Sequence, residues 1–295
     1  MPQPTSTRTI AGLPGGVFYM VVSAFSFSLM SLFVKVAGQT LPPMQIVLAR
    51  SVIVAVISYG VLRQAKISPW GHNRRLLILR GLVGFVALSC FYYAVTILPL
   101  AEVTVIHYMN PVFTALLAAL FLKEALSRAS IIALFLGLGG LVLVAQPDAL
   151  FGDAGTGLDL FAVAIALTGA FFAAMAYTIV RKLRETEALM VVVFYFAFVS
   201  TFASLPFLSL GAAWPSAVGW LVLLAVGIST HFEQVYLTKG LHAVRAGRAM
   251  SVSYVQILFA AIWGALFFAE IPNLITVLGG LLIVGAIFLV AKART

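Results

Sequence analysis

The amino-acid sequence predicts an all-α integral membrane protein with ten transmembrane helices, arranged as two inverted-topology five-helix repeats. Three observations predict this fold class: an extreme apolar composition, ten segments long enough to cross a bilayer, and an internal repeat of five segments. Of the 295 residues, 62% are hydrophobic and 9% are charged, whereas soluble domains average about 25% charged residues. So few charges cannot cover a water-facing surface, which excludes a soluble enzyme, a disordered protein and a nucleic-acid-binding protein.

Ten apolar segments follow one another along the chain. A transmembrane helix needs roughly 20 mostly apolar residues, and the connections between these segments are too short for a soluble domain. The first segment, 15–37, is longer than the hydrophobic region of a cleaved signal peptide, which spans about 7–15 residues. The other nine helices are expected at 44–62, 76–97, 101–122, 129–146, 158–181, 189–209, 216–239, 248–269 and 273–291.

The basic residues test this number of helices and orient them. With a cytoplasmic amino terminus, 16 of the 18 Lys and Arg residues, Arg80 among them, fall in cytoplasmic loops or at their helix ends, as the positive-inside rule requires. The longest outer connection, around 147–157, carries Asp148 and Asp153 instead. We therefore expect a multi-pass protein of the cell inner (plasma) membrane with both termini in the cytoplasm. The same bias accounts for the net charge of +9 without an anionic partner.

The chain repeats itself at a spacing of 146 residues. This shift superposes 108–124 on 254–270 with seven of 17 positions identical, including Glu124 and Glu270 in a chain that has six Glu in all. Because each half contains five helices, the second half must enter the membrane from the opposite side, as in many secondary transporters. The predicted domains are the two repeats, 1–146 and 147–295.

Two stretches carry a resemblance to a known family. The first has LPLA at 98–101, NP at 110–111 and FLKE at 121–124, and the second has AGRA at 246–249 and FFAEIP at 267–272. On these motifs, and over essentially the whole chain, the sequence resembles the EamA-type ten-helix transporters of the drug/metabolite transporter superfamily, which include exporters of amino acids and other small metabolites. The resemblance implies that helices 1, 3, 4, 6, 8 and 9 surround a central cavity and that helices 5 and 10 lie at the periphery.

The second half departs from this pattern at one position. Ile257 stands where the first half has Pro111. Proline removes a backbone donor and kinks a helix, so a kink in helix 4 need not recur in helix 9.

A polar stripe on the fourth helix is the first candidate for a substrate pocket. Polar side chains within a bilayer are costly and tend to face a cavity or another helix. His107, Asn110 and Thr114 share one helical face at the spacing i, i+3, i+7, and the 146-residue shift maps them to Ser253, Gln256 and Ala260. We interpret the two stripes as walls of a small polar pocket, and hydrogen bonding between helices is the alternative. The aromatic residues expected to line it, with core packing as the alternative, include Tyr92, Tyr108, Tyr177, Tyr254 and Trp263.

The eighth helix contributes a second polar cluster. Glu233 lies inside the expected span, where a carboxylate could exchange a proton or attract a substrate ammonium group, and an ion pair with Lys239 is the structural alternative. His231 is the second proton-coupling candidate, because histidine titrates near neutral pH when unperturbed. His231 and Gln234 are also expected substrate contacts.

The remaining membrane-depth charges are interpreted as structural. Arg50 lies within helix 2 and requires a partner that the sequence does not identify. Lys35, at the outer end of helix 1, is expected to extend its ammonium group toward the membrane surface. Glu102, at the start of helix 4, suits the positive end of a helix dipole. Glu124 and Glu270 occupy equivalent helix ends, which favours a shared structural role.

Signatures of catalysis and of metal or cofactor binding are missing from the sequence. It contains no HExxH, Walker A loop, GxSxG elbow or Cys/His metal set, and its one cysteine, Cys90, excludes an intrachain disulfide. We therefore expect no catalytic residue, cofactor or metal, and no nucleic-acid partner. The expected partners are a small-molecule substrate and the lipid bilayer, and the expected functional unit is a monomer.

The sequence thus predicts a secondary transporter that moves small organic metabolites across the inner membrane by alternating access. The resemblance favours export of amino acids, aromatic or other neutral ones among them. Three alternatives stay open: a multidrug or nucleotide-sugar carrier of the same fold, a membrane-embedded lipid-modifying enzyme, and a non-transporting receptor or scaffold. Phosphate groups on a substrate would require membrane-depth Lys or Arg, for which Lys35 and Arg50 are the candidates.

Overall fold

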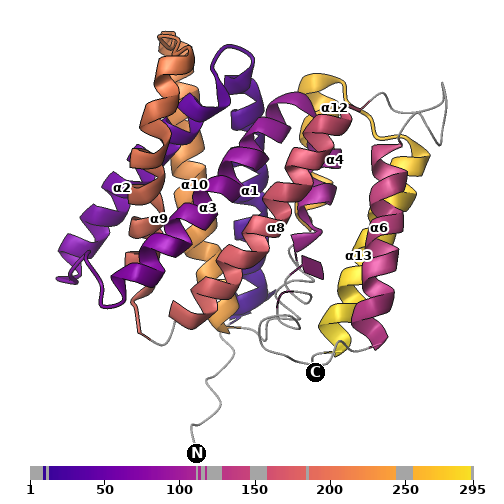
Figure 1. Cartoon of the computed structure of the whole chain (residues 1–295), viewed down its shortest axis with the longest axis horizontal. Coiled ribbons are helices and arrows are strands. Elements are labelled where there is room, and N and C mark those ends of the chain that lie inside the picture. Colours follow the sequence, from indigo (N-terminus) through magenta and orange to yellow (C-terminus); the bar gives the residue numbers. More distant parts are fainter. Residues whose placement is uncertain are drawn as a thin grey trace, which may run out of the picture.

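The computed structural model is a bundle of helices that run side by side (Figure 1). The structure describes residues 9–10, 13–110, 112–113, 117, 128–146, 158–183, 186–243 and 255–293. A two-residue antiparallel ladder, β1 (Thr9–Ile10) with β2 (Leu13–Pro14), precedes the first helix.

Ten α-helices and one 3₁₀ helix lie within the described residues. In the first half they are α1 (Gly15–Gly38), α2 (Pro43–Gln64), α3 (Arg74–Ile97), α4 (Leu100–His107) and α6 (Arg128–Ala145). In the second half they are α8 (Leu160–Leu183), α9 (Leu189–Ser204), η2 (Leu205–Leu210), α10 (Ala217–Ala243), α12 (Val255–Phe268) and α13 (Leu274–Ala293).

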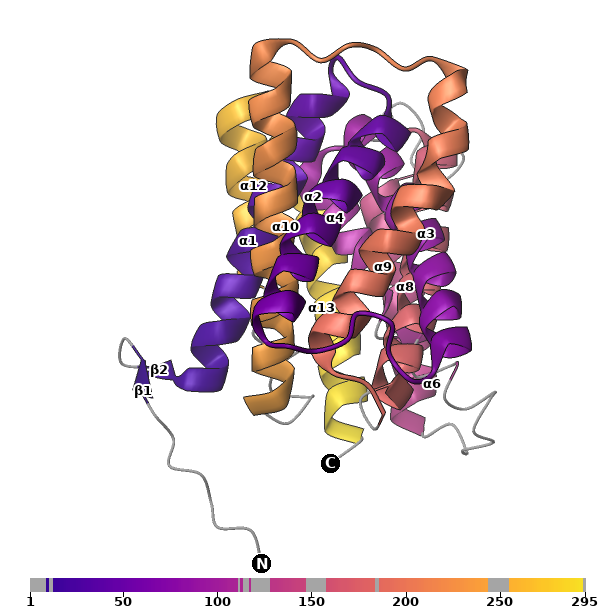
Figure 2. The same cartoon turned by 90° about the vertical axis from the view of Figure 1, so that its left-hand side faces the viewer.

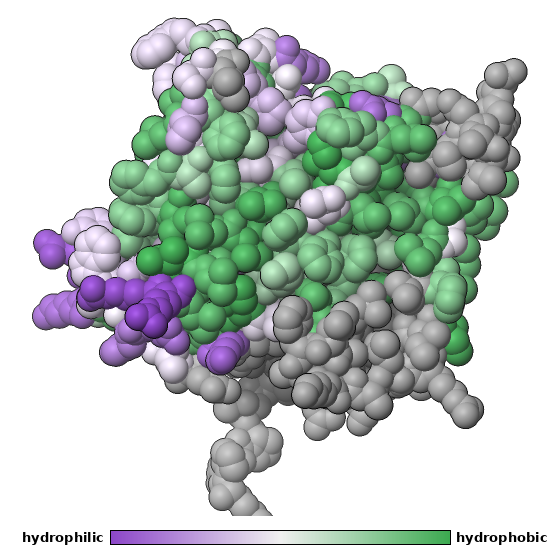
Figure 3. All heavy atoms as spheres, viewed as in Figure 1, coloured by the Kyte–Doolittle hydropathy of each residue, from purple (hydrophilic) through white to green (hydrophobic). Residues whose placement is uncertain are grey.

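These helices confirm the expected order of the spans. In the described part of the chain, six helices are long and apolar enough to cross a membrane, and α12 and parts of α6 and α13 form shorter apolar helices. Large apolar side chains such as Phe135 (69% exposed) and Phe161 (65% exposed) cover the outside of the bundle. Figure 3 shows hydrophobic residues across the middle of one face and hydrophilic residues toward its ends. This pattern is what a lipid-facing surface requires.

Local chemistry explains where several helices begin. Pro43 stands at the first position of α2, where its missing N–H costs no hydrogen bond. The Asn73 side chain caps α3 by accepting from the backbone N–H of Leu76 at 3.3 Å, which satisfies one of the free amides at a helix start. Pro206 lies in η2, where α9 gives way to a tighter turn.

The fourth helix is interrupted at the end of α4. The α-helical hydrogen bonds of α4 end at Tyr108, whose N–H is shared between the carbonyls of Thr104 (3.2 Å) and Val105 (3.1 Å). Pro111 follows three residues later and provides no backbone donor. In the second half, α12 begins at Val255 and continues through Ile257 to Phe268. The interruption in the first half therefore lies next to Pro111 in sequence, and the segment that corresponds to it in the second half, around residue 254, lies outside the described residues.

The packing obeys the symmetry of the repeat. α1 packs extensively on α10, and their counterparts α8 and α3 pack on each other in the same way. α2 meets its own counterpart α9, α4 meets α12, and α6 meets α13. Figure 2 shows that α1 begins and α13 ends at the same end of the bundle. The chain therefore folds as two inverted five-helix repeats that interlock.

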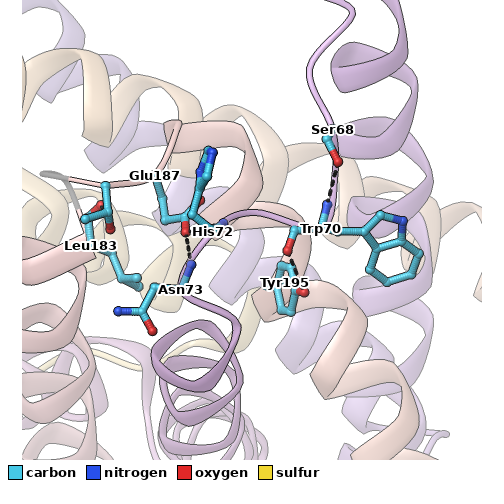
Figure 4. A network of polar contacts seen from close by, with 8 residues as sticks. Ser68, Trp70, His72, Asn73, Leu183, Glu187 and Tyr195 are labelled. Carbon is cyan, nitrogen blue, oxygen red and sulfur yellow. Dashed lines mark hydrogen bonds and ion pairs between the residues drawn. The ribbon is translucent and has the colours of Figure 1, made fainter.

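Polar side chains tie the loops of the two halves together at both ends. Gln45, on α2, exchanges two hydrogen bonds with the backbone of Ala213, at 2.6 and 3.0 Å. At the other end, the Glu187 carboxylate accepts from the backbone N–H groups of His72 and Asn73, at 2.6 and 2.5 Å (Figure 4). The Tyr195 hydroxyl donates to the Trp70 carbonyl beside it, at 3.0 Å. These contacts hold the α2–α3 loop and the α9–α10 connection against the opposite repeat.

α6 and α13 form a separate pair at one edge of the bundle (Figure 1), which confirms the peripheral position that the resemblance implied for helices 5 and 10. Their backbones approach closely at Gly140 and Gly279. A Cβ atom on either glycine would lie 2.6 Å from the carbonyl oxygen of the other. Small residues allow such close helix contact in membranes.

Replacing Gly140 by Leu is expected to separate α6 from α13 and to lower the free energy of unfolding by about 1–3 kcal/mol, because overpacking forces backbone shifts. Thermal unfolding of the detergent-purified protein measures this change. Gly139→Leu is the control, since a Cβ atom there meets nothing within 4 Å. Equal effects of the two substitutions would contradict the glycine contact.

Candidate functional site

The interrupted end of α4 meets the second repeat through a direct hydrogen bond. The Tyr108 hydroxyl donates to Gln256 Oε1 at 3.0 Å, and each of these two residues is 6% exposed. Asn110, at 4% exposure, is buried on the same segment. The bond therefore joins two predicted pocket residues, one from each repeat, next to the break in the helix. Transporters use such interrupted helices to present polar groups near the middle of the membrane.

His107 lies among aromatic rings. Its ring stacks on Phe27 of α1, with 5.8 Å between centroids, and lies 4.8 Å from Phe91 of α3. Within the described residues, its Nδ1 atom has no hydrogen-bond partner. The geometry makes His107 part of an aromatic wall between α1, α3 and α4.

Trp263 of α12 faces α1. Its indole Nε1 donates to Ser28 Oγ at 3.1 Å, and its ring lies 6.3 Å from that of Phe25. Trp263 thus anchors α12 to α1 on the second-repeat side of the same region. Three further predicted pocket residues, Thr114, Ser253 and Tyr254, lie outside the described residues.

Two arginines lie inside the bundle against one phenylalanine. The guanidinium carbons of Arg50 (α2) and Arg80 (α3) lie 4.9 and 4.0 Å from the centroid of the Phe196 ring (α9). Arg50 is 2% exposed. Within the described residues, Nε and Nη1 of both arginines are buried without a hydrogen-bond partner. We call Arg50, Arg80, Phe196 and Glu233 the arginine cluster.

Gly84 makes room for the second guanidinium. It stands one turn after Arg80 on α3, and a Cβ atom there would lie 2.2 Å from Arg80 Nη1 and 2.8 Å from the Phe196 ring. Any side chain at this position would displace Arg80 from the ring. The local sequence therefore places the guanidinium over Phe196.

Glu233 of α10 supplies the negative charge of the cluster. It is 8% exposed and interacts electrostatically with both Arg50 and Arg80. Among the described groups, no arginine nitrogen lies within 4.0 Å of its carboxylate. Lys239, the partner weighed from the sequence, lies over the Tyr236 ring at 5.3 Å instead.

Two predicted tyrosines border the arginine cluster. Tyr92 of α3 is fully buried and interacts electrostatically with Arg50 and Glu233. Tyr177 of α8 interacts electrostatically with Arg80 and Glu233. Tyr92 is also adjacent in sequence to Phe91, which contacts His107. The arginine cluster and the Tyr108–Gln256 bond therefore belong to one continuous region of the core.

The other two candidates on α10 are His231 and Gln234. His231 is half-buried, with its ring edge-on to Phe232 at 6.5 Å, and in the described part its Nδ1 atom has no hydrogen-bond partner. Gln234 is also half-buried. The backbone carbonyl of Glu233, between them, accepts from Ser23 Oγ at 3.2 Å, which ties α10 to α1.

The arginine cluster corrects two expectations. Arg80 was assigned to the cytoplasmic loops and helix ends, but its guanidinium lies inside the bundle over Phe196. The resemblance placed helices 2 and 7 outside the set that surrounds the centre, yet α2 and α9 supply Arg50 and Phe196. One signal was present in the sequence, because the 146-residue shift maps Arg50 onto Phe196. Residues related in this way can meet where the two repeats face each other.

Contact with the Phe196 ring does not offset the free-energy cost of burying the two guanidinium groups. Contact with an aromatic face stabilises a desolvated guanidinium by about 2 kcal/mol, whereas burying an ion costs several kcal/mol. One carboxylate faces two guanidinium groups, so the described residues carry a net charge of +1 at this place when Glu233 is ionised.

A second charged contact closes the region at the far end of α1. Lys35 Nζ donates to the Glu270 carboxylate and, at 2.8 Å, to the carbonyl of Leu98. The other Glu270 oxygen accepts from the Leu100 N–H at 3.0 Å. Glu102, in the first turn of α4, lies within electrostatic reach of the pair. Lys35 is 8% exposed, so the expectation that it extends to the membrane surface is wrong. The ion pair joins α1 and the α3–α4 junction to the end of α12.

Known proteins are similar to this chain in sequence and in fold. The sequence pattern of the EamA-like transporter family matches residues 14–146 and again 160–292. The pseudopaline exporter CntI of Pseudomonas aeruginosa (strain UCBPP-PA14) is 33% identical over 283 residues, which are 96% of this chain and 98% of the exporter. Human solute carrier family 35 member G1 is 32% identical over 290 residues, covering 94% of this chain and 79% of the carrier.

A solved crystal structure has the same fold. It superposes with a TM-score of 0.63 over 91% of this chain and 95% of its own, at 18% sequence identity. Two successive family matches, one for each five-helix half, agree with the packing symmetry described above. The chain therefore belongs to the EamA-like transporter family of the drug/metabolite transporter superfamily and is a multi-pass membrane protein of a small-molecule transporter family.

Proposed function

We propose that this protein exports amino acids or closely related small metabolites across the inner membrane, by alternating access between its two inverted repeats and as a monomer. The observation that carries the proposal is the meeting of buried polar groups from both repeats at the break in α4, where Tyr108 bonds to Gln256 at 3.0 Å. A solute bound there touches both halves, so a change in their relative position changes the side from which the solute is accessible.

Three further observations support the proposal. The relative with 33% identity carries the name of a pseudopaline exporter. The region between α3, α4, α10 and α12 combines aromatic rings with a few polar groups, which is typical of sites for small organic ligands. The Lys35–Glu270 pair links the two repeats at one end of the bundle, and a contact of this kind must open if that end is to admit solute.

The energy source in this proposal is proton exchange at Glu233 or His231. Glu233 faces Arg50 on α2 and Arg80 and Tyr92 on α3, and Tyr177 on α8. His231 lies two residues before it on α10. Downhill uniport is the alternative, and the response of transport to a pH gradient separates the two.

The test is uptake into proteoliposomes of labelled amino acids and cationic drugs, with and without a pH gradient. We expect amino-acid transport that falls about tenfold in Gln256→Ala, because loss of a buried hydrogen-bond partner costs about 1–3 kcal/mol. Asn110→Ala is expected to act in the same direction. Gln64→Ala, at the exposed end of α2, serves as the control. Unchanged transport in both pocket variants would contradict the site, and transport of drugs alone would favour the multidrug alternative.

A further inference from the structure

The charges of the arginine cluster do not balance within the protein. Arg50 and Arg80 contribute two positive charges and Glu233 one negative charge. In the part of the chain that the structure describes, Nε and Nη1 of each guanidinium are buried without a hydrogen-bond acceptor. Arginine side chains inside a membrane protein normally pair with a carboxylate or a backbone carbonyl. Here the buried donors are left without an acceptor.

The arrangement also holds the two guanidinium groups in place for a ligand. Both rest on the Phe196 ring, at 4.9 and 4.0 Å, and Gly84 leaves the space that Arg80 occupies. A guanidinium presents its donors as a planar fork that matches a carboxylate in a bidentate contact. Because the ring contact already orients each fork, little side-chain freedom is lost when an anion binds.

From these contacts we infer that the solute carried by this protein bears a net negative charge, and that its additional carboxylate binds to Arg50 and Arg80. This inference rests on the proposed function and specifies its substrate class. A neutral amino acid is a zwitterion, so it leaves the net charge of +1 in the cluster unchanged. An acidic amino acid carries one net negative charge, so it brings the total to zero, with Glu233 facing the ammonium group of the solute.

Charge balance also separates a carboxylate from a phosphate, although both fit a guanidinium fork. A phosphate monoester carries close to two negative charges at neutral pH, which exceeds the +1 of the cluster unless Glu233 takes up a proton. The structure thus favours a carboxylate over a phosphate, and a phosphate ester belongs in the test as a separate arm.

The experiment compares solutes of equal shape and different charge. Wild-type proteoliposomes are assayed for counterflow of each labelled solute separately. The rate for L-glutamate is compared with that for L-glutamine, and the rate for L-aspartate with that for L-asparagine. Malate and sn-glycerol 3-phosphate are assayed in the same way. We expect each acid to be transported at least about tenfold faster than its amide, and both acids faster than malate and the phosphate ester, which each carry about two negative charges. Arg50→Gln and Arg80→Gln are expected to abolish this preference. Arg63→Gln and Arg75→Gln, exposed positions on the same two helices, are expected to retain it.

A binding measurement tests the role of Arg50 and Arg80 without requiring transport. Glutamate is expected to raise the melting temperature of the detergent-purified wild-type protein, since a ligand that binds the folded state stabilises it. The shift should vanish in Arg50→Gln and persist in part in Arg50→Lys, which keeps the charge and loses the fork. Glutamine is expected to give no shift.

The outcomes distinguish the two proposals. If no solute is transported by the wild type but glutamate still stabilises it through Arg50, the proposed function fails and the anion site stands. If glutamine moves as fast as glutamate, if the phosphate ester moves faster than both acids, or if the arginine variants keep the preference for acids, the charge inference is wrong while the proposed function stands. A wild type that neither transports nor binds any of these solutes contradicts both.

Discussion

Replacing Lys35 by Ala is expected to lower the free energy of unfolding by about 3 kcal/mol and to remove most transport activity. The substitution leaves the Glu270 carboxylate with the Leu100 N–H as its hydrogen-bond partner at this place, and breaking a buried ion pair by removing one partner costs about 3–5 kcal/mol. We take the lower figure because the Glu270 side chain is 21% exposed. Thermal unfolding in detergent and uptake into proteoliposomes measure the two effects.

A charge exchange tests whether the pair itself is responsible. The double variant Lys35→Glu/Glu270→Lys is expected to recover part of the stability that either single substitution loses. Recovery should be incomplete, because the Leu98 carbonyl accepts from a cation and the Leu100 N–H donates to an anion. Lys182→Ala, at an exposed position of α8, controls for the loss of a lysine. A double variant no more stable than the worse single variant would show that the ion pair is not the source of the effect.

Replacing Glu233 by Gln is expected to destabilise the empty protein by about 1–3 kcal/mol and to make transport insensitive to a pH gradient. The amide leaves Arg50 and Arg80 as two buried positive charges that repel each other without a counter-charge. It also removes one of the two groups proposed for proton exchange, so loss of the pH response would assign the coupling to Glu233 and not to His231. Thermal unfolding and uptake with and without a pH gradient provide the two readouts.

A second substitution separates these two consequences. Glu233→Gln/Arg80→Gln restores a net charge of +1 to the cluster, so its stability is expected to return toward that of the wild type. Its transport should still ignore the pH gradient, because no carboxyl group is present at position 233. Wild-type transport that ignores the gradient, or a Glu233→Gln protein that still responds to it, would contradict the role of Glu233 in proton coupling.

The contact between the two repeats at the break in α4 was predictable from the sequence in part. Tyr108 and Gln256 were candidates on two helices that the repeat relates, and they meet through a hydrogen bond. His107 was a candidate by the same spacing, yet its ring packs between Phe27 and Phe91. Helical periodicity shows which residues share a face, but the neighbour of that face depends on how distant helices pack.

The arginine cluster could not be predicted from the sequence. Arg80 is the seventh residue of α3, and a basic residue so close to a helix end is typical of a cytoplasmic anchor. Its guanidinium turns inward because Gly84 leaves an empty place beside Phe196. Lys239, six residues further along the same helix, was the expected partner of Glu233, but Glu233 interacts electrostatically with arginines on α2 and α3 instead.

By itself, the sequence determined that the protein lies in a membrane, crosses it with ten helices, and consists of two inverted halves. Those properties depend on local apolar content and on a fixed spacing of 146 residues, which can be read along one chain. The tertiary structure decided which charges meet. Lys35 and Glu270 are 235 residues apart, and Arg50 and Phe196 are 146 apart. Contacts over such separations depend on the packing of all the helices, because only that packing removes water from between the side chains.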